Sequence, residues 1–167
     1  MKQIKDFLGN TMEFECMGCA ISNDKINIPG GIIYNGKYSI LGVDPEIPIP
    51  GFLVINIKRH VKSFADLEMN EIMEIGWIIK NAEKVLKDLN VTSEITLVQE
   101  ERSKHLHVWI FPTHDWMIEK YGKGITYLRN ISNYAQEKAT EKDINETLLV
   151  AKNVKNYFKN INFNEKR

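Results

Sequence analysis

The pattern of apolar and polar residues alternates most clearly over residues 104–112, Lys-His-Leu-His-Val-Trp-Ile-Phe-Pro. A period of two predicts a half-buried β-strand, because successive side chains of a strand point to opposite faces of the sheet. His105, His107 and Trp109 are therefore expected on one face, with the aliphatic residues between them on the other. The two imidazoles would lie roughly 6–7 Å apart along the strand, close enough to serve one site. Two ordinary half-buried histidines are the alternative.

Apolar runs elsewhere predict the rest of the sheet. Residues 32–34 and 37–43 are expected to form a hairpin across Asn35-Gly36, since Asn-Gly between apolar runs is the strongest short hairpin signal. A buried strand is expected over residues 52–57, and residues 91–98 are also rich in β-forming residues.

Three- and four-residue spacing of apolar residues predicts helices. The first covers about residues 66–89, is capped by Ser63 or Asp66, and has a buried stripe of Ile72, Ile75, Ile79, Ala82, Leu86 and Leu89. Two more are expected at about 124–138 and 141–160, the last beginning at Thr140 with Asp143 and burying Ile144, Leu148, Ala151, Val154 and Phe158. For the first 15 residues a short helix docked on the core is the expectation.

This order of elements predicts a single α+β domain with a mainly antiparallel sheet, one long covering helix and two C-terminal helices. Its core is expected at about residues 16–116, and residues 117–167 form a helical extension. The length of 167 residues suits one domain, and the hydrophobic content of 43% is ordinary for a globular protein.

Charge and hydropathy exclude several classes of partner. Lys plus Arg and Asp plus Glu number 22 each, so no net charge draws the chain to a nucleic-acid polymer or an anionic membrane. No apolar run approaches the ~20 residues that span a bilayer, and the polar N-terminus does not resemble a signal peptide. A cytoplasmic protein is expected.

The two cysteines, Cys16 and Cys19, form a single C-x-x-C. This motif has three interpretations: half of a zinc site, a redox pair, or two incidental small residues. A redox pair is expected at the start of a helix, and no helical pattern follows here. Zinc would need two further ligands, for which histidines are available.

Three motifs together resemble the histidine-triad (HIT) superfamily. Residues 104–112 are similar to its His-φ-His-φ-His-φ-φ signature. Residues 50–61, Pro-Gly-Phe-Leu-Val-Ile-Asn-Ile-Lys-Arg-His-Val, look like its "PGH-LVIPKRHV" strand, and the early C-x-x-C is similar to zinc-bearing members. The resemblance runs from about Cys16 to Pro112, with a helix between the second and third motifs.

The resemblance implies a HIT-like fold and a homodimer whose sheets join. It also implies a nucleotide hydrolase or nucleotidyl transferase acting at the α-phosphate of a nucleoside phosphoramidate or dinucleoside polyphosphate. By position, His107 would be the nucleophile, and His105 would support it or bind zinc. His60 matches a histidine that closes the same cluster, and Asp44 matches the position that binds ribose hydroxyls.

Three positions depart from the family pattern. Trp109 replaces the third histidine, Phe52 stands at the histidine of "PGH", and Glu101-Arg102-Ser103 replaces a Gly-Gln-Ser/Thr type of run that contacts phosphate. If the first histidine were the missing one, Ser103 would take its place and His105 would be the nucleophile. His107 is preferred, because transferase relatives lack the third histidine and carry the C-x-x-C.

A neutral imidazole can attack phosphorus to give a nucleotidyl-histidine, which water or another phosphate then resolves. Arg102, Ser103 and Lys104 are near enough in sequence to bind the phosphate, and an exposed turn is the alternative. We expect His114 to be an ordinary surface histidine rather than part of the catalytic site. Trp109 is expected as a hydrophobic wall or core residue rather than a base-stacking one.

The resemblance also suggests a structural zinc site of Cys16, Cys19, His60 and His105, with all four positions filled by protein. Its alternative is a hydrogen-bonded pair of His105 and His60 that supports His107. Besides the enzyme, a non-catalytic nucleotide-binding or regulatory module and a zinc-stabilised scaffolding dimer remain possible functions.

Overall fold

A central antiparallel sheet organises the structure. The computed structural model describes residues 1–100 and 102–163, and in this part of the chain the large sheet has five strands. Their spatial order is β3 (Tyr34–Asn35), β4 (Ser39–Val43), β5 (Leu53–Ile57), β7 (His107–Pro112) and β6 (Ile95–Val98). The predicted hairpin between β3 and β4 is confirmed, but its turn lies two residues later than predicted. Asn35 pairs with Ile40 and the Gly36 N–H donates to the Ser39 carbonyl, so Lys37 and Tyr38 form the loop.

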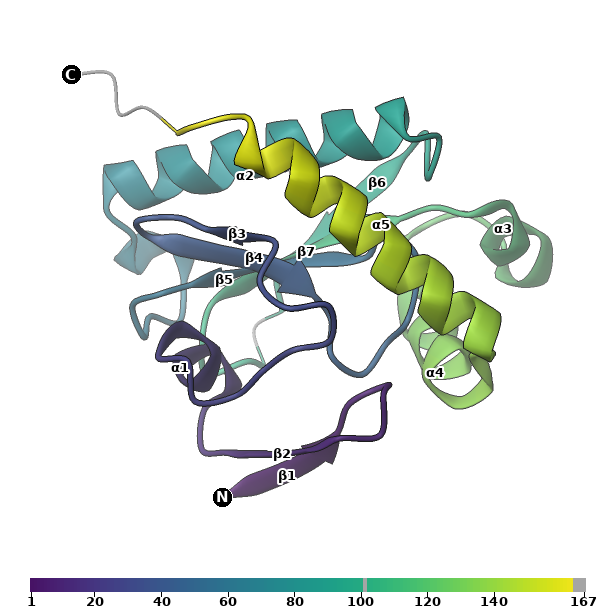
Figure 1. Cartoon of the computed structure of the whole chain (residues 1–167), viewed down its shortest axis with the longest axis horizontal. Coiled ribbons are helices and arrows are strands. Elements are labelled where there is room, and N and C mark those ends of the chain that lie inside the picture. Colours follow the sequence, from purple (N-terminus) through teal and green to yellow (C-terminus); the bar gives the residue numbers. More distant parts are fainter. Residues whose placement is uncertain (101, 164–167) are drawn as a thin grey trace.

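Helices cover both faces of this sheet (Figure 1). One face carries α2 (Met69–Asp88) and α5 (Glu141–Lys159). The other carries α1 (Met17–Ser22) at one end and α3 (Asp115–Tyr121) with α4 (Leu128–Lys138) at the other. Short 3-10 turns, η1 (Phe64–Asp66) and η2 (Ile125–Tyr127), precede α2 and α4. The predicted α+β class with one long covering helix is confirmed, and α3 is an element that the sequence pattern did not predict.

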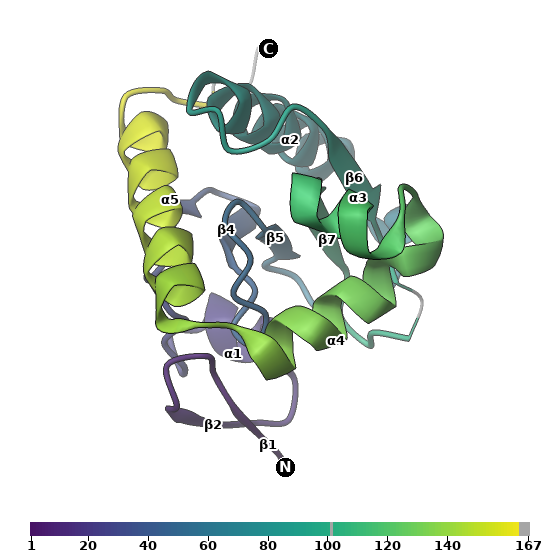
Figure 2. The same cartoon turned by 90° about the vertical axis from the view of Figure 1, so that its right-hand side faces the viewer.

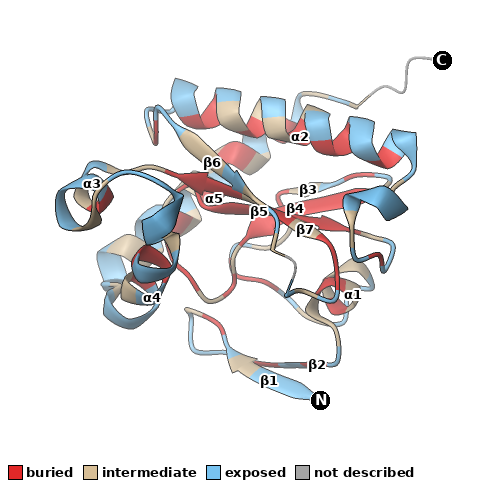
Figure 3. Ribbon diagram, turned by 180° about the vertical axis from the view of Figure 1, so that it is seen from behind, coloured by how far each residue is buried: buried red, intermediate tan, exposed pale blue. Residues whose placement is uncertain are grey.

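The main core lies between the sheet and the α2–α5 layer (Figure 3). Strands β5 and β7 point their alternate aliphatic residues into it, and α2 and α5 close it with Ile75, Ile78, Ala82, Val85, Leu86, Ala151, Val154 and Phe158. A second apolar cluster on the opposite face joins Phe52 and Phe111 to Met117, Ile131 and Ala135 of α3 and α4. The sheet is therefore buried on both sides along most of its length.

The buried stripe predicted for α2 is only partly right. Ile75, Ala82 and Leu86 are buried, but Ile72 and Leu89 are 37% and 39% exposed. Glu71 and Glu74 are buried on the inner side of the helix instead. Glu71 accepts two hydrogen bonds from Arg59 at 2.8 and 2.7 Å, and Glu74 accepts from the backbone N–H groups at the β3–β4 turn. Such partners permit carboxylates to be buried where an apolar pattern predicts aliphatic residues.

Capping residues set the helix limits. Ser63 and Asp66 form a reciprocal capping box at η1, and α2 itself begins after Glu68 rather than at residue 66. Thr140 and Asp143 form the predicted capping box of α5. On α5 the buried residues are Thr147, Ala151, Val154 and Phe158, while Ile144 and Leu148 are only half-buried.

The first residues form a hairpin and not the expected helix. β1 (Lys2–Lys5) pairs antiparallel with β2 (Thr11–Phe14) around a turn that the buried carboxylate of Asp6 stabilises by accepting from Leu8 and Asn10. Met12 and Phe14 are buried in a small cluster with Ala20 of α1, separate from the main core. Across the described residues no helix has the length and apolar character needed to cross a membrane.

We predict that Ile78→Ala lowers the free energy of unfolding by about 2–5 kcal/mol, because Ile78 is completely buried and the substitution leaves a cavity. Urea unfolding followed by tryptophan fluorescence measures the change. Leu149→Ala on α5 is the control, since Leu149 is 56% exposed and its loss should change stability by less than about 0.5 kcal/mol. Equal effects of the two substitutions would contradict the assigned core.

Candidate functional site

The segment that contains His105 and His107 has the predicted alternation. Val108 and Ile110 face the core under α2, whereas Trp109 packs with the cluster on the opposite face. β7 itself begins at His107, and the two residues before it continue alongside the end of β5, with the Leu106 N–H donating to the Val61 carbonyl. His107 therefore lies on the face between α1 and α4.

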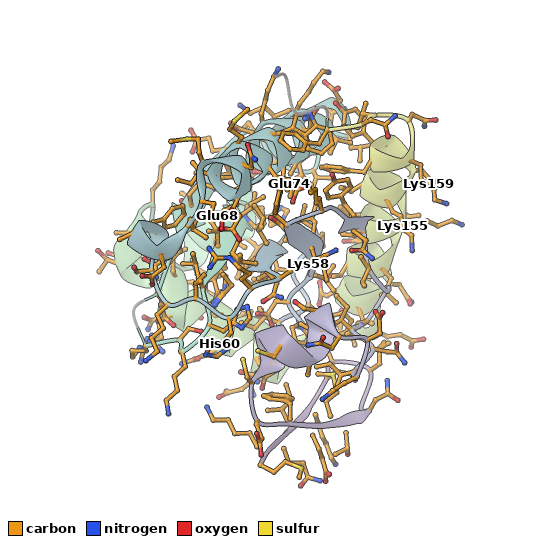
Figure 4. All side chains as sticks on the ribbon, turned by 90° about the vertical axis from the view of Figure 1, so that its left-hand side faces the viewer. Lys58, His60, Glu68, Glu74, Lys155 and Lys159 are labelled. Carbon is orange, nitrogen blue, oxygen red and sulfur yellow. The ribbon has the colours of Figure 1, made fainter. Side chains whose placement is uncertain are left out.

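Four potential metal ligands converge beneath α1. The Sγ atoms of Cys16 and Cys19 lie 3.3 and 3.5 Å from Nδ1 of His105. The same two sulfur atoms lie 3.5 and 3.1 Å from Nδ1 of His60. All four ligand atoms are within 4.8 Å of one another. Figure 4 shows His60 beside α1, and Lys58 and His60 both follow the end of β5.

These separations suit tetrahedral zinc. Zinc–sulfur and zinc–nitrogen bonds of about 2.3 and 2.0–2.1 Å at a tetrahedral angle place sulfur and nitrogen about 3.6 Å apart. The observed values of 3.1 to 3.5 Å are close to this separation. Gly18 permits the approach of α1, because a Cβ there would lie 2.6 Å from the ring of His105. The side chains predicted to bind zinc are thus brought together in a compatible arrangement.

Protonation favours metal binding as well. Nε2 of His105 lies 2.6 Å from the Ile57 carbonyl, which can only accept, so Nε2 carries the proton and Nδ1 presents its lone pair to the sulfur atoms. Burial lowers the pKa of His105 despite this hydrogen bond, which favours the neutral form of the ring. Burial and the nearby sulfur of Cys16 raise the pKa of the Cys19 thiol, which a bound cation would offset.

The C-x-x-C is followed by a helix, contrary to the sequence-based expectation. Cys16 is the N-cap of α1, and its Sγ accepts from the Cys19 N–H at 3.5 Å. This helix has only six residues and does not follow a strand of the large sheet. With His60 and His105 beside both sulfur atoms, the arrangement is that of a four-ligand cluster.

His107 has one ring nitrogen bound and the other available. Its Nδ1 lies 3.1 Å from the backbone carbonyl of His105. A carbonyl can only accept, so Nδ1 carries the proton and Nε2 of the neutral ring holds a lone pair. In His105, by contrast, both nitrogens face partners. His107 is half-buried, on the sheet face opposite α2.

Trp109 and Phe52, the two aromatic departures from the family pattern, contact each other. Their ring centroids are 5.1 Å apart in an edge-to-face arrangement. Trp109 is half-buried, with its ring centroid 6.4 Å from that of His107. The structure therefore gives Trp109 the predicted wall position, packed between His107 and the α3–α4 cluster.

Asp44 follows β4 directly. One carboxylate oxygen accepts from the Glu46 and Ile47 N–H groups at 2.9 and 3.0 Å, which shapes the start of the proline-rich loop. Burial raises its pKa to about 6 in spite of these bonds. The carboxylate is therefore already part of a turn, and only its second oxygen has no hydrogen bond to the described part of the chain.

The residues before His105 form a tight turn. The Ser103 hydroxyl donates to the His105 carbonyl at 2.6 Å, and Arg102 pairs with Glu100. Lys104 is exposed, and Glu101 lies outside the described residues. His114 is not the expected surface histidine: it is half-buried and its Nε2 donates to the Pro50 carbonyl at 2.7 Å, away from the cysteine–histidine cluster.

Asn56 was not predicted as part of the site. It pairs with His107 across β5 and β7, and its amide donates to the Gly18 carbonyl at 3.0 Å and to the Ser22 hydroxyl at 2.9 Å. It thus fastens α1 to the sheet beside His107. One polar residue inside the apolar run 52–57 was the available signal.

Comparison with known proteins supports the fold alone. No protein-family model and no curated protein matches the chain by sequence. Among solved structures, it is similar to a zinc-bound histidine triad family protein from Mycobacterium smegmatis, with TM-score 0.62 and 10% identity over 88% of this chain and 98% of that one. It is also similar to a hypothetical histidine triad nucleotide-binding protein from Sulfolobus tokodaii, with TM-score 0.61 and 17% identity over 87% and 93%.

A Hit-like protein from Bartonella henselae, described as involved in cell-cycle regulation, gives TM-score 0.59 and 14% identity over 87% and 98% of the two chains. All three neighbours are covered almost completely, so the likeness extends over the whole domain. The chain therefore has the histidine-triad fold, as residues 50–61 and 104–112 predicted.

Proposed function

We propose that this protein is a histidine-triad enzyme, a nucleotide hydrolase or nucleotidyl transferase whose nucleophile is His107. The observation that carries the proposal is the hydrogen bond from Nδ1 of His107 to the His105 carbonyl. It leaves Nε2 of this half-buried ring without a hydrogen bond to the described part of the chain, at the start of β7. His105 is the poorer nucleophile, because both of its ring nitrogens face other groups.

The proposed reaction has two displacements at the α-phosphorus of a nucleotide. Nε2 of His107 forms a bond to phosphorus while the leaving group departs with its electron pair. Water or a second phosphate then attacks the same phosphorus and releases His107. Arg102 and the turn around Ser103 are the proposed phosphate contacts, and Asp44 is the proposed ribose contact through its second oxygen. The Sulfolobus neighbour's description as nucleotide-binding supports this substrate class.

Zinc is the proposed structural ion of the cluster formed by Cys16, Cys19, His60 and His105. A fully protein-ligated zinc would supply no reactive position, but would fix α1 against the end of β5 and the ring of His105. The zinc-bound Mycobacterium neighbour supports the assignment by analogy of fold. Because the His105 carbonyl orients His107, the ion would act on the nucleophile through that residue.

A homodimer is also proposed. β6 is an edge strand of the large sheet, and Leu97 on it is 47% exposed on the same face as α2. α5 packs along one side of α2, and Ile72 and Met73 remain 37% and 41% exposed. Figure 2 shows β6 and α5 on opposite sides of α2. A second copy could pair at the β6 edge and cover these apolar residues.

We predict that His107→Ala reduces kcat on a nucleoside phosphoramidate and on a dinucleoside polyphosphate by about a thousandfold or more, because the covalent route is lost. Release of nucleoside monophosphate measures turnover, and mass spectrometry of a rapidly quenched reaction detects the nucleotidyl adduct. His114→Gln is the control, since His114 is bonded elsewhere. Unchanged turnover in His107→Ala would contradict the assignment of His107 as the nucleophile. Nucleotide binding by the wild type without turnover would instead indicate a non-catalytic nucleotide-binding module.

We predict one zinc ion per chain, lost in a Cys16→Ser, Cys19→Ser double variant with a fall in melting temperature. Metal content by mass spectrometry gives the stoichiometry. Cobalt substitution should produce a thiolate charge-transfer absorption in the wild type and not in the double cysteine variant. His107→Ala is the matched control, because it removes a neighbouring imidazole that is outside the cluster and should retain the zinc. A wild-type protein without stoichiometric metal would refute the site.

We predict that Leu97→Lys combined with Ile72→Lys converts a wild-type dimer into a monomer, because two charges are placed in the proposed apolar contact. Sedimentation equilibrium measures the mass, and circular dichroism verifies that the variant is folded. Leu149→Lys, at an exposed position on α5, should remain dimeric. A monomeric wild type rules out the dimer.

A further inference from the structure

Two arginines from distant segments bind the same carboxylate beside the proposed nucleophile. Arg102 belongs to the loop before β7, and Arg129 to the first turn of α4. Each places its Nη2 on Oε1 of Glu100, at 2.9 Å for Arg129. The arginine side chains are 59% and 63% exposed, and that of Glu100 is 31% exposed. The trio thus carries one net positive charge.

The trio joins the loop that leads to His107 with α4. β6 runs antiparallel to β7 and ends at Val98, opposite Trp109, so Glu100 lies two residues beyond the strand, in the loop that leads to His107. Val98 and Trp109 share the sheet face that also carries His107. On α4, the neighbours of Arg129 in the helix, Leu128 and Ile131, pack in the cluster that contains Trp109.

The two guanidinium groups have donors to spare. Each has five N–H donors, and the contact with Glu100 uses only Nη2. Within residues 1–100 and 102–163, neither guanidinium makes another hydrogen bond. No acidic residue lies in the first turn of α4. Paired, solvent-open guanidiniums are the arrangement that binds phosphate groups in a bidentate manner.

The wall beside His107 suits a leaving group that needs no proton. Departure of an amine requires a general acid, whereas a phosphate leaves as an anion. Trp109, the next residue on the face of His107, packs against Phe52 and has no acidic proton to give. Charge would instead accumulate on the departing phosphate, where fixed cations stabilise it.

We propose that Arg102 and Arg129, held by Glu100, bind the phosphate chain of the leaving group, so that the substrate is a phosphoanhydride such as a dinucleoside polyphosphate and not a phosphoramidate. This rests on the proposed function. The bond from Nε2 of His107 to the α-phosphorus forms as the bridging P–O bond breaks, and the electron pair goes to the leaving β-phosphate oxygen. The guanidiniums hold the resulting charge.

The kinetic test compares substrate selectivity in wild type, Arg129→Gln and Arg129→Lys. The ratio of kcat/KM for a dinucleoside tetraphosphate to that for a nucleoside phosphoramidate should fall about 10- to 100-fold in Arg129→Gln, as expected for loss of a hydrogen bond to a charged group. Arg129→Lys should recover part of the ratio. Lys84→Gln, which breaks a comparably exposed ion pair on α2, should leave it unchanged. If Arg129 only connects α4 to the loop structurally, Arg129→Gln should lower kcat/KM equally for both substrates. That result overturns the proposal.

A binding test separates this inference from the proposed chemistry. Inorganic tripolyphosphate, titrated by calorimetry into the full chain carrying His107→Ala, measures the anion site without turnover. Adding Arg129→Gln to that variant should weaken binding at least about tenfold. If neither substrate is turned over but this weakening is found, the catalytic function fails and the anion site stands. Tripolyphosphate affinity that Arg129→Gln does not change overturns the anion site, whatever the turnover.

Discussion

The buried imidazole of His105 connects the two halves of the candidate site. Its ring is fixed at both nitrogens, Nδ1 towards the two cysteines and Nε2 on the Ile57 carbonyl. Its backbone carbonyl accepts from Nδ1 of His107 at 3.1 Å and from the Ser103 hydroxyl at 2.6 Å. A residue held this firmly gives its carbonyl little freedom, and so the ring of His107 is also fixed. A shift of α1 would therefore reach His107 through this residue.

Asn56 adds a second restraint on the same geometry. Its side chain joins α1 to β5 directly opposite His107, and Gly18 permits the close contact that this requires. The cysteine–histidine cluster and the amide of Asn56 therefore hold α1 against the sheet at two separate points. Preorganisation of this kind matters for a nucleophile, because misplacement by about 1 Å can cost two orders of magnitude in rate.

Much of the fold could be predicted from local patterns, and the errors have physical causes. The period-two run at residues 104–112 and the Asn-Gly pair are local signals, and they predicted a strand and a hairpin that the structure has, although β7 begins only at His107 and the turn lies at residues 37–38. The predicted buried face of α2 was partly wrong because Glu71 and Glu74 find partners just after β5 and at the β3–β4 turn, which an apolar pattern cannot show. The N-terminal hairpin depends on the carboxylate of Asp6 within its turn.

The site shows the same division between local and distant information. The histidines at 105 and 107 were placed by alternation, whereas the partners of the cysteines came from the family resemblance, since nothing local connects residues 16 and 60. Arg129 carries no signal in its own segment. It meets Glu100 only because α4 packs across the face of the sheet, 29 residues further along the chain.

Trp109 and the C-terminal helices form one structural unit. Ile131 and Ala135 of α4 and Met117 of α3 build an apolar cluster against Phe52 and Phe111, and Trp109 packs on it. An imidazole at position 109 would bury less apolar surface against this cluster than the indole does. Conversely, without α3 and α4 the aromatic residues would be left exposed on the sheet. The aromatic residue at position 109 and the helices α3 and α4 therefore stabilise each other by packing, and the same packing brings Arg129 to Glu100.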